Sequence, residues 1–270
     1  MSCACGHHHD HHAAPIITGG KPVELPRPLI HVSGQLICQD MGQMLLAMEL
    51  LPEHVALSRA EPGCVRFDLR QEDDPLVWQL DELFANEDAF TAHQARNAAS
   101  RWGKESAGIA RDLHRESVVP RIRPEVKQDR AGIAALLTAA FGGQDEAKLV
   151  DLLREDGDLA LSLVADAAGT VVGHVALSPL KAEGPALALA PVAVHPALHG
   201  LGIGAALVRA ALEAIPDHTI VVLGDPSYYN RFGFAPADLA SPYAGPHLMA
   251  LGPGLAAGSH IAHAKAFAAL

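Results

Sequence analysis

The segment LAPVAVHPALHGLGIGAALVRAAL, residues 189–212, constrains the fold more than any other. An apolar strand, a glycine-rich turn and an amphipathic helix follow one another there without a break. Gly200, Gly202 and Gly204 lack Cβ atoms, so the backbone can approach a ligand closely. The N–H groups of such a turn, at the positive end of a helix, bind anions. We therefore predict a pyrophosphate cradle of seven residues: His199, Gly200, Leu201, Gly202, Ile203, Gly204 and Ala205.

Two familiar nucleotide motifs do not fit this loop. A Walker loop requires Lys and then Ser or Thr after its last glycine, whereas Ala205 and Ala206 stand here. A dinucleotide fingerprint requires G-x-G-x-x-G and a later acidic residue, and this chain has neither. The loop resembles instead the acyl-CoA loop of the GNAT superfamily of N-acetyltransferases, which reads Gln or Arg, two residues, Gly, any residue, then Gly or Ala. Residues 199–204 match this pattern except for His199 at its first position.

The segment VVLGDPSYYNRFGF, residues 221–234, carries a second part of this resemblance. In GNAT enzymes, a Tyr four residues before a Gly-Phe pair lies near the CoA sulfur and protonates the departing thiolate. Tyr229 has this spacing to Gly233, so the resemblance implies that it is the general acid. The alternative is that Tyr228 and Tyr229 pack on the sheet with satisfied hydroxyl groups.

The GNAT resemblance runs from about Arg121 to the C-terminus. It implies that the backbone of Val192, Ala193 and Val194 binds the acetyl carbonyl and the pantetheine, which would polarise the thioester. Residues 131–155 have apolar positions at helical spacing in two blocks divided by Gly142 and Gly143, and such a helix pair walls the acceptor pocket.

The acceptor amine must lose a proton before it attacks, so a base is required. Three candidates are Glu146 in the pocket helix, His174 on the strand VVGHVAL, and Asp225 in the turn before the tyrosines. Each has a structural alternative: Glu146 on a solvated helix face, His174 as a satisfied sheet histidine, and Asp225 as a helix cap.

The first part of the chain predicts a different domain, because strand, helix, strand, strand and helix follow one another from Leu29. It resembles the antibiotic biosynthesis monooxygenase family of dimeric, ferredoxin-like α+β barrels. The matching segments are EPGC at 61–64, the turn at 73–75 and residues 82–93. The resemblance implies a homodimer and a cavity in which Trp78 and His93 lie. The alternative for both is a packing role, with the domain serving oligomerisation or sensing.

The N-terminal twelve residues, MSCACGHHHDHH, combine thiols and imidazoles that can hold zinc, nickel or copper. We favour a natural metal-binding tail over an affinity tag, which is normally an unbroken run of six histidines. The candidate ligands are Cys3, Cys5, His7, His8, His9, His11 and His12.

We accordingly expect two domains, an α+β barrel module and a GNAT fold with a mixed sheet flanked by helices. The expected boundaries are a flexible tail at 1–27, a monooxygenase-like domain at 28–112, a linker at 113–120 and an acetyltransferase domain at 121–270.

Bulk properties limit the function without choosing it. A formal charge of -11 argues against nucleic acid as a partner. Four scattered cysteines, and the lack of a signal peptide or a long apolar span, predict a cytoplasmic protein without a membrane anchor.

We predict an acetyl-CoA-dependent N-acetyltransferase that acts on an amine of a small molecule or a peptide. One alternative is a metal- or small-molecule-responsive protein that holds CoA without turnover. The other is a bifunctional monooxygenase and acetyltransferase, which an enclosed cavity around Trp78 and His93 would favour.

Overall fold

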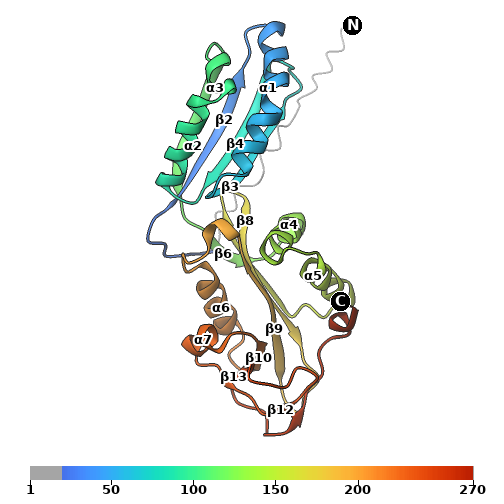
Figure 1. Cartoon of the computed structure of the whole chain (residues 1–270). Coiled ribbons are helices and arrows are strands. Elements are labelled where there is room, and N and C mark those ends of the chain that lie inside the picture. The colour runs from blue at the N-terminus through green and yellow to red at the C-terminus, as the bar shows by residue number, and fades with distance from the viewer. Residues whose placement is uncertain (1–19, 270) are drawn as a thin grey trace, which may run out of the picture.

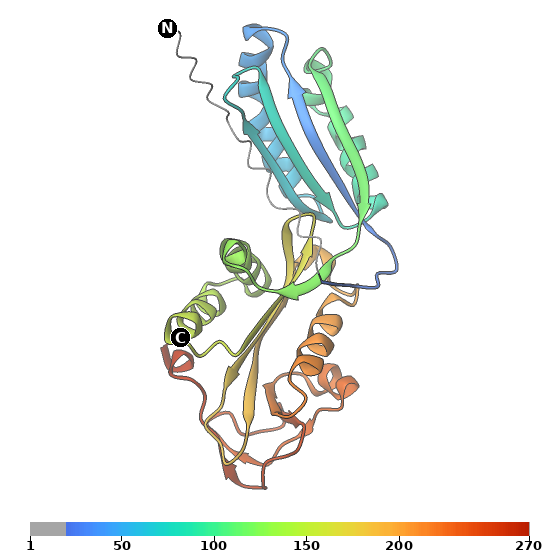
Figure 2. The same ribbon diagram turned by 180° about the vertical axis from the view of Figure 1, so that it is seen from behind.

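The computed structural model describes residues 20–269, which form two domains (Figure 1). The N-terminal domain is a four-stranded antiparallel sheet in the order β3-β4-β2-β5. Three helices cover one face of this sheet and leave the other face uncovered (Figure 2). The elements are β2 (Leu29–Ile37), α1 (Met41–Arg59), β3 (Cys64–Gln71), β4 (Val77–Phe84), α2 (Glu87–Ala99), α3 (Arg101–Glu105) and β5 (Ala110–Val118).

Local chemistry fixes the helix starts in this domain. Asp40 caps α1 by accepting a hydrogen bond from the Gln43 N–H, and Asn86 caps α2 through the Ala89 N–H. Ile30, Val32 and Leu36 alternate along β2 and face the helices, which gives the domain its core. The predicted order of strand, helix, strand, strand and helix is confirmed.

The predicted linker at 113–120 is wrong over most of its length. Residues 113–118 belong to β5, which pairs with β2 from Leu29↔Val118 to Ile37↔Ala110. Nearly every side chain of β5 is exposed, so the strand lacks the alternation of apolar and polar residues that identifies strands in sequence. The connection to the next strand is therefore only two residues, 119–120.

The C-terminal domain is built on an eight-stranded mixed sheet in the order β1-β6-β7-β8-β9-β10-β13-β11. Its strands are β1 (Lys21–Pro22), β6 (Arg121–Pro124), β7 (Leu161–Ala167), β8 (Thr170–Pro179), β9 (Ala186–Val194), β10 (Thr219–Leu223), β11 (Ala235–Pro236) and β13 (Leu248–Leu251). Strands β12 (Leu239–Ala240) and β14 (Ser259–His260) form a small separate sheet.

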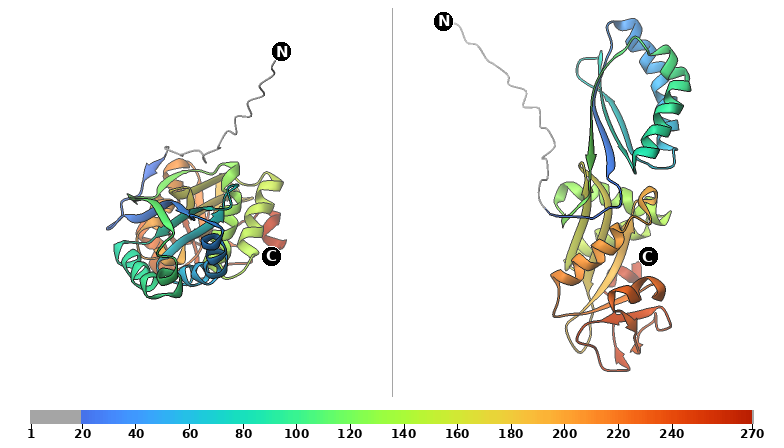
Figure 3. Two further views of the ribbon diagram at one scale, coloured as in Figure 1. Left: turned by 90° about the horizontal axis from the view of Figure 1, so that it is seen from above. Right: turned by 90° about the vertical axis from the view of Figure 1, so that its left-hand side faces the viewer.

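Helices cover both faces of this sheet (Figures 1 and 3). On one face lie α4 (Arg130–Phe141) and α5 (Asp145–Asp156), and on the other lie α6 (Ile203–Ala214) and α7 (Pro226–Tyr229). Gly142 and Gly157 end α4 and α5 in the left-handed conformation, which glycine adopts without strain. The predicted helix, loop and helix at 131–155 are thus confirmed. Four short 3-10 helices complete the domain: η1 (Lys127–Asp129), η2 (Pro196–Leu198), η3 (Asn230–Phe232) and η4 (Lys265–Ala269).

The predicted flexible tail is partly wrong, because residues 20–23 join the C-terminal domain. Lys21 and Pro22 pair with Ile122 and Arg121, so β1 extends the sheet from its β6 edge. Val23 is buried, and its N–H donates to the carbonyl oxygen of Pro120. This pairing connects segments about 100 residues apart, which local sequence patterns cannot reveal. The proposed metal ligands Cys3 to His12 lie outside the described residues.

The two domains share a packed junction. Leu29 and Leu83 of the N-terminal sheet belong to the same buried cluster as Ile122 and Val172. The guanidinium of Arg66 donates to the carbonyl oxygen of Ala168, in the turn between β7 and β8, over 3.2 Å. Within residues 20–269, no helix is long and apolar enough to cross a membrane.

Candidate active site

A cavity of about 390 Å³ lies where β9, the glycine loop and α7 meet. It brings together residues that are some 40 positions apart in the sequence. Its wall consists of Val192, Val194, Leu198, His199, Gly200, Gly202, Ile203, Gly204, Ala205, Tyr228, Tyr229 and Arg231. Most of the predicted cradle and the predicted acid therefore face one space.

The glycine loop presents free backbone donors to this cavity. Gly200 and Gly202 have φ angles of +80° and +87°, which side chains other than glycine rarely adopt. Gly202 is the N-cap of α6 and has no side chain to accept from the first turn, so the N–H groups of residues 203–205 remain available to an anion. The imidazole Nε2 of His199 lies 3.0 Å from the Val194 carbonyl oxygen, and this contact ties the loop to the end of β9.

Strand β9 is splayed from its parallel neighbour. It pairs with β8 as far as Val194, but with β10 only at Ala186, Leu187 and Ala188. The backbone groups on the β10 side of residues 189–194 are therefore not used in the sheet. Val192 and Val194 point into the cavity, whereas the Ala193 side chain packs with Ile133 and Leu137 on the opposite face. Ala193 can serve a ligand only through its backbone.

Two tyrosines line the cavity, not one. Tyr229 packs edge-on against Phe234 with ring centroids 5.6 Å apart, and its ring also covers Gly224. Burial raises the pKa of Tyr229 to about 12, so its phenol stays protonated at neutral pH and is able to donate. Tyr228 stacks under the guanidinium of Arg231 at 4.5 Å, and both residues line the cavity. Sequence reasoning missed Arg231, although it stands two residues after Tyr229.

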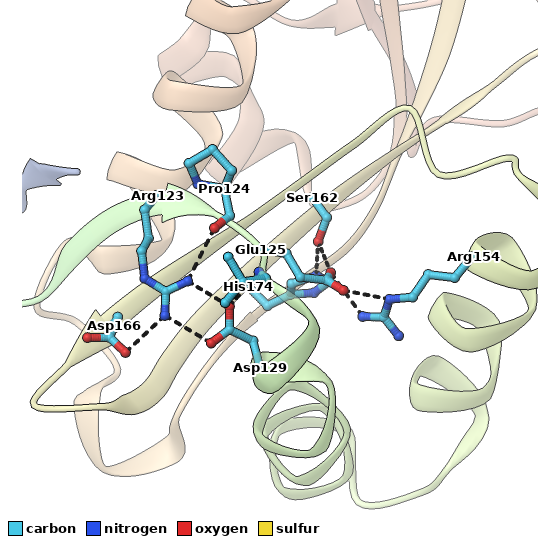
Figure 4. A network of polar contacts seen from close by, with 9 residues as sticks. Arg123, Pro124, Glu125, Asp129, Arg154, Ser162, Asp166 and His174 are labelled. Atoms are coloured by element: carbon cyan, nitrogen blue, oxygen red, sulfur yellow. Dashed lines mark hydrogen bonds and ion pairs between the residues drawn. The ribbon is translucent and has the colours of Figure 1, made fainter. Parts of the chain in front are cut away.

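His174 does not line this cavity. It is fully buried on β8, on the face covered by α4 and α5, and its Nε2 lies 2.9 Å from Ser162 Oγ (Figure 4). Ser162 donates in turn to Glu125, which Arg154 holds through two hydrogen bonds of 2.7 and 3.0 Å. Burial lowers the pKa of His174 to about 4. The structure therefore favours a buried packing role for this residue over the role of a base, although its Nδ1 has no hydrogen-bond partner among the described residues.

A second buried network lies beside the first in Figure 4. Arg123 bonds both carboxylate oxygens of Asp129, at 2.6 and 2.9 Å, and also reaches Asp166 at 3.2 Å. The two networks tie β6, β7, β8 and α5 together beneath the sheet.

The two remaining base candidates lie away from the cavity wall. Asp225 caps α7, because its carboxylate accepts from the Ser227 N–H at 2.8 Å and from the Ser227 hydroxyl at 2.7 Å. Glu146 lies in the first turn of α5 and is partly exposed. Of the three, only Glu146 is neither fully buried nor committed to capping a helix.

The N-terminal domain contains a separate cavity of about 190 Å³ between its sheet and its helices. His93 lines it, as predicted, but Trp78 does not. Trp78 packs with the cluster around Leu36 and α1 instead, and the tryptophan of the cavity is Trp102. Trp102 lies on α3, which is separate from α2, although the sequence predicts a single helix over this stretch. The domain has its own polar cavity residues: His54, Glu82, His93, Gln94, Asn97 and Arg111.

Comparison with known proteins agrees with this division. Residues 130–234 match the model of the acetyltransferase (GNAT) family, and residues 43–105 match that of the antibiotic biosynthesis monooxygenase family. The protein therefore combines a GNAT fold with a monooxygenase-like module. Uncharacterised N-acetyltransferase YhbS of Escherichia coli K12 is 45% identical over 120 residues, which are 42% of this chain and 72% of that protein.

One further relative and one solved structure extend the comparison. Uncharacterised N-acetyltransferase YjhQ of the same strain is 37% identical over 131 residues, 45% of this chain and 72% of the relative. The structure of Escherichia coli YhbS in complex with CoA has a TM-score of 0.51 and 35% identity, and it covers 55% of this chain and 92% of that one. The chain belongs to the GNAT family of N-acetyltransferases.

Proposed function

We propose that this protein transfers the acetyl group of acetyl-CoA to an amine of a small molecule. The observation that carries the proposal is the single cavity in which the splayed edge of β9, the free N–H groups at Gly202 and the two tyrosines meet. The related YhbS structure was determined with CoA, which supports the choice of donor.

Different parts of the cavity bind different parts of acetyl-CoA. The backbone N–H groups from His199 to Ala205 bind the pyrophosphate at the N-terminus of α6. The unused backbone of residues 192–194 binds the pantetheine and polarises the thioester carbonyl by hydrogen bonding. Arg231, above Tyr228, supplies positive charge beside the same cavity.

Direct attack by the acceptor amine on the thioester completes the reaction. Tyr229, which lines the cavity with its phenol protonated at neutral pH, gives that proton to the departing thiolate. Glu146 does not line this cavity, so we propose it as the base for the acceptor through a chain of water molecules, since His174 is enclosed and Asp225 caps a helix.

The test combines binding and turnover. Calorimetric titration with acetyl-CoA is followed by incubation with a panel of amines, and release of the free thiol is recorded. Binding with turnover on an amine supports the transferase. Binding without turnover on any amine supports the alternative of a CoA-binding sensor, and lack of binding contradicts both.

We also propose a homodimer formed through the uncovered face of the N-terminal sheet. Gln79 and Gln35 lie on that face, opposite each other in β4 and β2, and are only partly exposed. Sedimentation of the full chain at micromolar concentration tests the dimer, and a monomer there contradicts it. Among residues 20–269 no group of three His, Cys, Asp or Glu side chains forms a metal site, so the proposed divalent metal rests on the tail.

A further inference from the structure

The cavity of the N-terminal domain contains a carboxyl group without a hydrogen-bond partner among the described residues. Glu82 on β4 is 5% exposed and lines the cavity, where one of its carboxyl oxygens lies 3.9 Å from Nε2 of His93. The surrounding wall is mainly apolar and includes Val32, Phe67 and Leu80. A buried carboxyl is costly unless it is neutral or meets a ligand, so this position requires an explanation.

His93 faces Glu82 in a defined orientation. Its Nδ1 lies 2.8 Å from a carboxylate oxygen of Glu61, and Arg96 holds the other oxygen of that carboxylate at 2.6 Å. Nδ1 lies 2.8 Å from Glu61, which only accepts, and 3.3 Å from the guanidinium of Arg96, which only donates. The shorter contact favours a proton on Nδ1 and a lone pair on Nε2 toward Glu82. Glu61 therefore positions His93 as a base.

The carboxyl groups of Glu82 and Glu61 have different surroundings, which suits Glu82 to act as an acid and Glu61 to orient His93. Arg96 and His93 contact Glu61, whereas Glu82 has no hydrogen-bond partner among the described residues and lies 3.9 Å from the imidazole of His93. Burial, with the Glu61 charge, raises the pKa of Glu82 to about 8. Burial also lowers the pKa of His93 against the opposing effect of Glu61. At neutral pH the site thus contains a protonated acid beside an unprotonated base.

We propose that this cavity is a second catalytic site, in which His93 and Glu82 interconvert the keto and enol forms of a small uncharged carbonyl compound. His93 Nε2 takes a proton from the carbon next to the carbonyl, and the C–H electron pair becomes the carbon–carbon double bond. The carbonyl π pair moves to oxygen, which takes the proton of Glu82. The reverse step returns a proton to carbon, so atoms and electrons balance without an oxidant or a metal.

The size of the cavity limits the substrate. About 190 Å³ is room for roughly six water molecules at about 30 Å³ each, which corresponds to a single ring or a short chain. The apolar wall favours a hydrocarbon body, and Glu82 and His93 lie close enough together to reach a carbonyl oxygen and its neighbouring carbon at once. Cyclohexanone and 2-hydroxycyclohexanone are suitable probes.

The experiment follows exchange of the α-protons of these two ketones for deuterium by ¹H NMR in D₂O, with the full chain. We expect exchange above the buffer rate for at least one probe, and a loss of about 100-fold or more in His93→Gln. Glu82→Gln should lose at least 10-fold, whereas Glu53→Gln, an exposed glutamate on α1, should exchange like the unmodified protein. Circular dichroism and urea unfolding of each variant report whether the N-terminal domain, which holds both residues, is folded.

The pH profile separates catalysis from a structural role. Exchange should rise as His93 loses its proton and fall above about pH 8 as Glu82 ionises. Glu61→Gln should move the acid limb to lower pH, because the neighbouring carboxylate raises the pKa of His93. Arg96, Asp81 and the thiol of Cys64 also interact with these two groups, and His54 and Arg111 line the same cavity. The limbs are therefore compared only between matched variants.

Two results overturn the proposal. The first is exchange of both ketones at the rate seen with His93→Gln. The second is dioxygen consumption with hydroquinone that depends on His93, which would assign the cavity to oxidation. Neither result bears on acetyl transfer, because the glycine-loop cavity lies in the other domain.

Discussion

The hydroxyl oxygen of Tyr228 lies 3.0 Å from the position that a Cβ atom would take on Gly204. The first turn of α6 and helix α7 therefore approach each other at the cavity wall, and a side chain at position 204 would crowd this tyrosine. Tyr228 reaches toward the glycine loop, while the Tyr229 ring covers Gly224 at the end of β10. The adjacent tyrosines thus occupy different parts of one site.

This difference predicts unequal effects of removing the two hydroxyl groups. Tyr229→Phe should lower kcat by about 10- to 100-fold, because the thiolate then leaves without a positioned acid. Tyr228→Phe should change mainly the KM for acetyl-CoA, since this residue borders the anion-binding turn. Steady-state kinetics of thiol release across pH measures both. Full activity of Tyr229→Phe at every pH would remove Tyr229 from the role of acid.

Helix α6 packs so closely on β8 at Gly173 that a side chain there should lower the stability of the protein. A Cβ there would lie 2.8 Å from Leu207 Cδ1 and 3.0 Å from Ile203 Cγ2, both on buried faces of α6. Gly173→Ala should therefore destabilise the protein by about 1–3 kcal/mol. Gly143→Ala is the matched control, because its Cβ would meet no atom within 4 Å. Urea unfolding measures both, and equal midpoints would show that β8 and α6 are not packed as described.

The lowered pKa of His174 should make the folded protein less stable in mild acid. Its pKa is about 4 in the folded chain, against 6.5 for an exposed histidine, so below pH 6.5 the unfolded chain binds a proton that the folded chain does not. Between pH 7 and pH 5 this costs about 2 kcal/mol of unfolding free energy. His174→Gln should reduce the drop between these two pH values by a similar amount. His54, whose pKa is about 3, should retain its own share in that variant.

The glycine loop, the tyrosine segment and the α4–α5 pair could be predicted because each depends on residues close in sequence. Gly202 at the start of α6 and Gly142 at the end of α4 each fix a local backbone conformation, and local patterns report such positions directly.

Features that depend on distant contacts could not be predicted in this way. β1 exists because Lys21 meets Ile122, and β5 pairs with β2 although its own side chains are almost all exposed. Trp78 and Trp102 are equally suited to a cavity by residue type, and only the placement of α3 decides between them. Histidine is a common catalytic base, but the burial of His174 beneath α4 and α5 depends on tertiary packing, which the sequence pattern does not report.

The most direct test of the acetyl-CoA site is calorimetric titration of the full chain and of Gly202→Val with acetyl-CoA. Gly202 has a φ of +87° at the N-cap of α6, so valine would both distort the turn and cover the free N–H groups. We expect saturable binding by the unmodified chain and a loss of at least 10-fold in affinity for the variant, with circular dichroism unchanged. Equal affinity in the two proteins would contradict the assignment of the pyrophosphate to this loop.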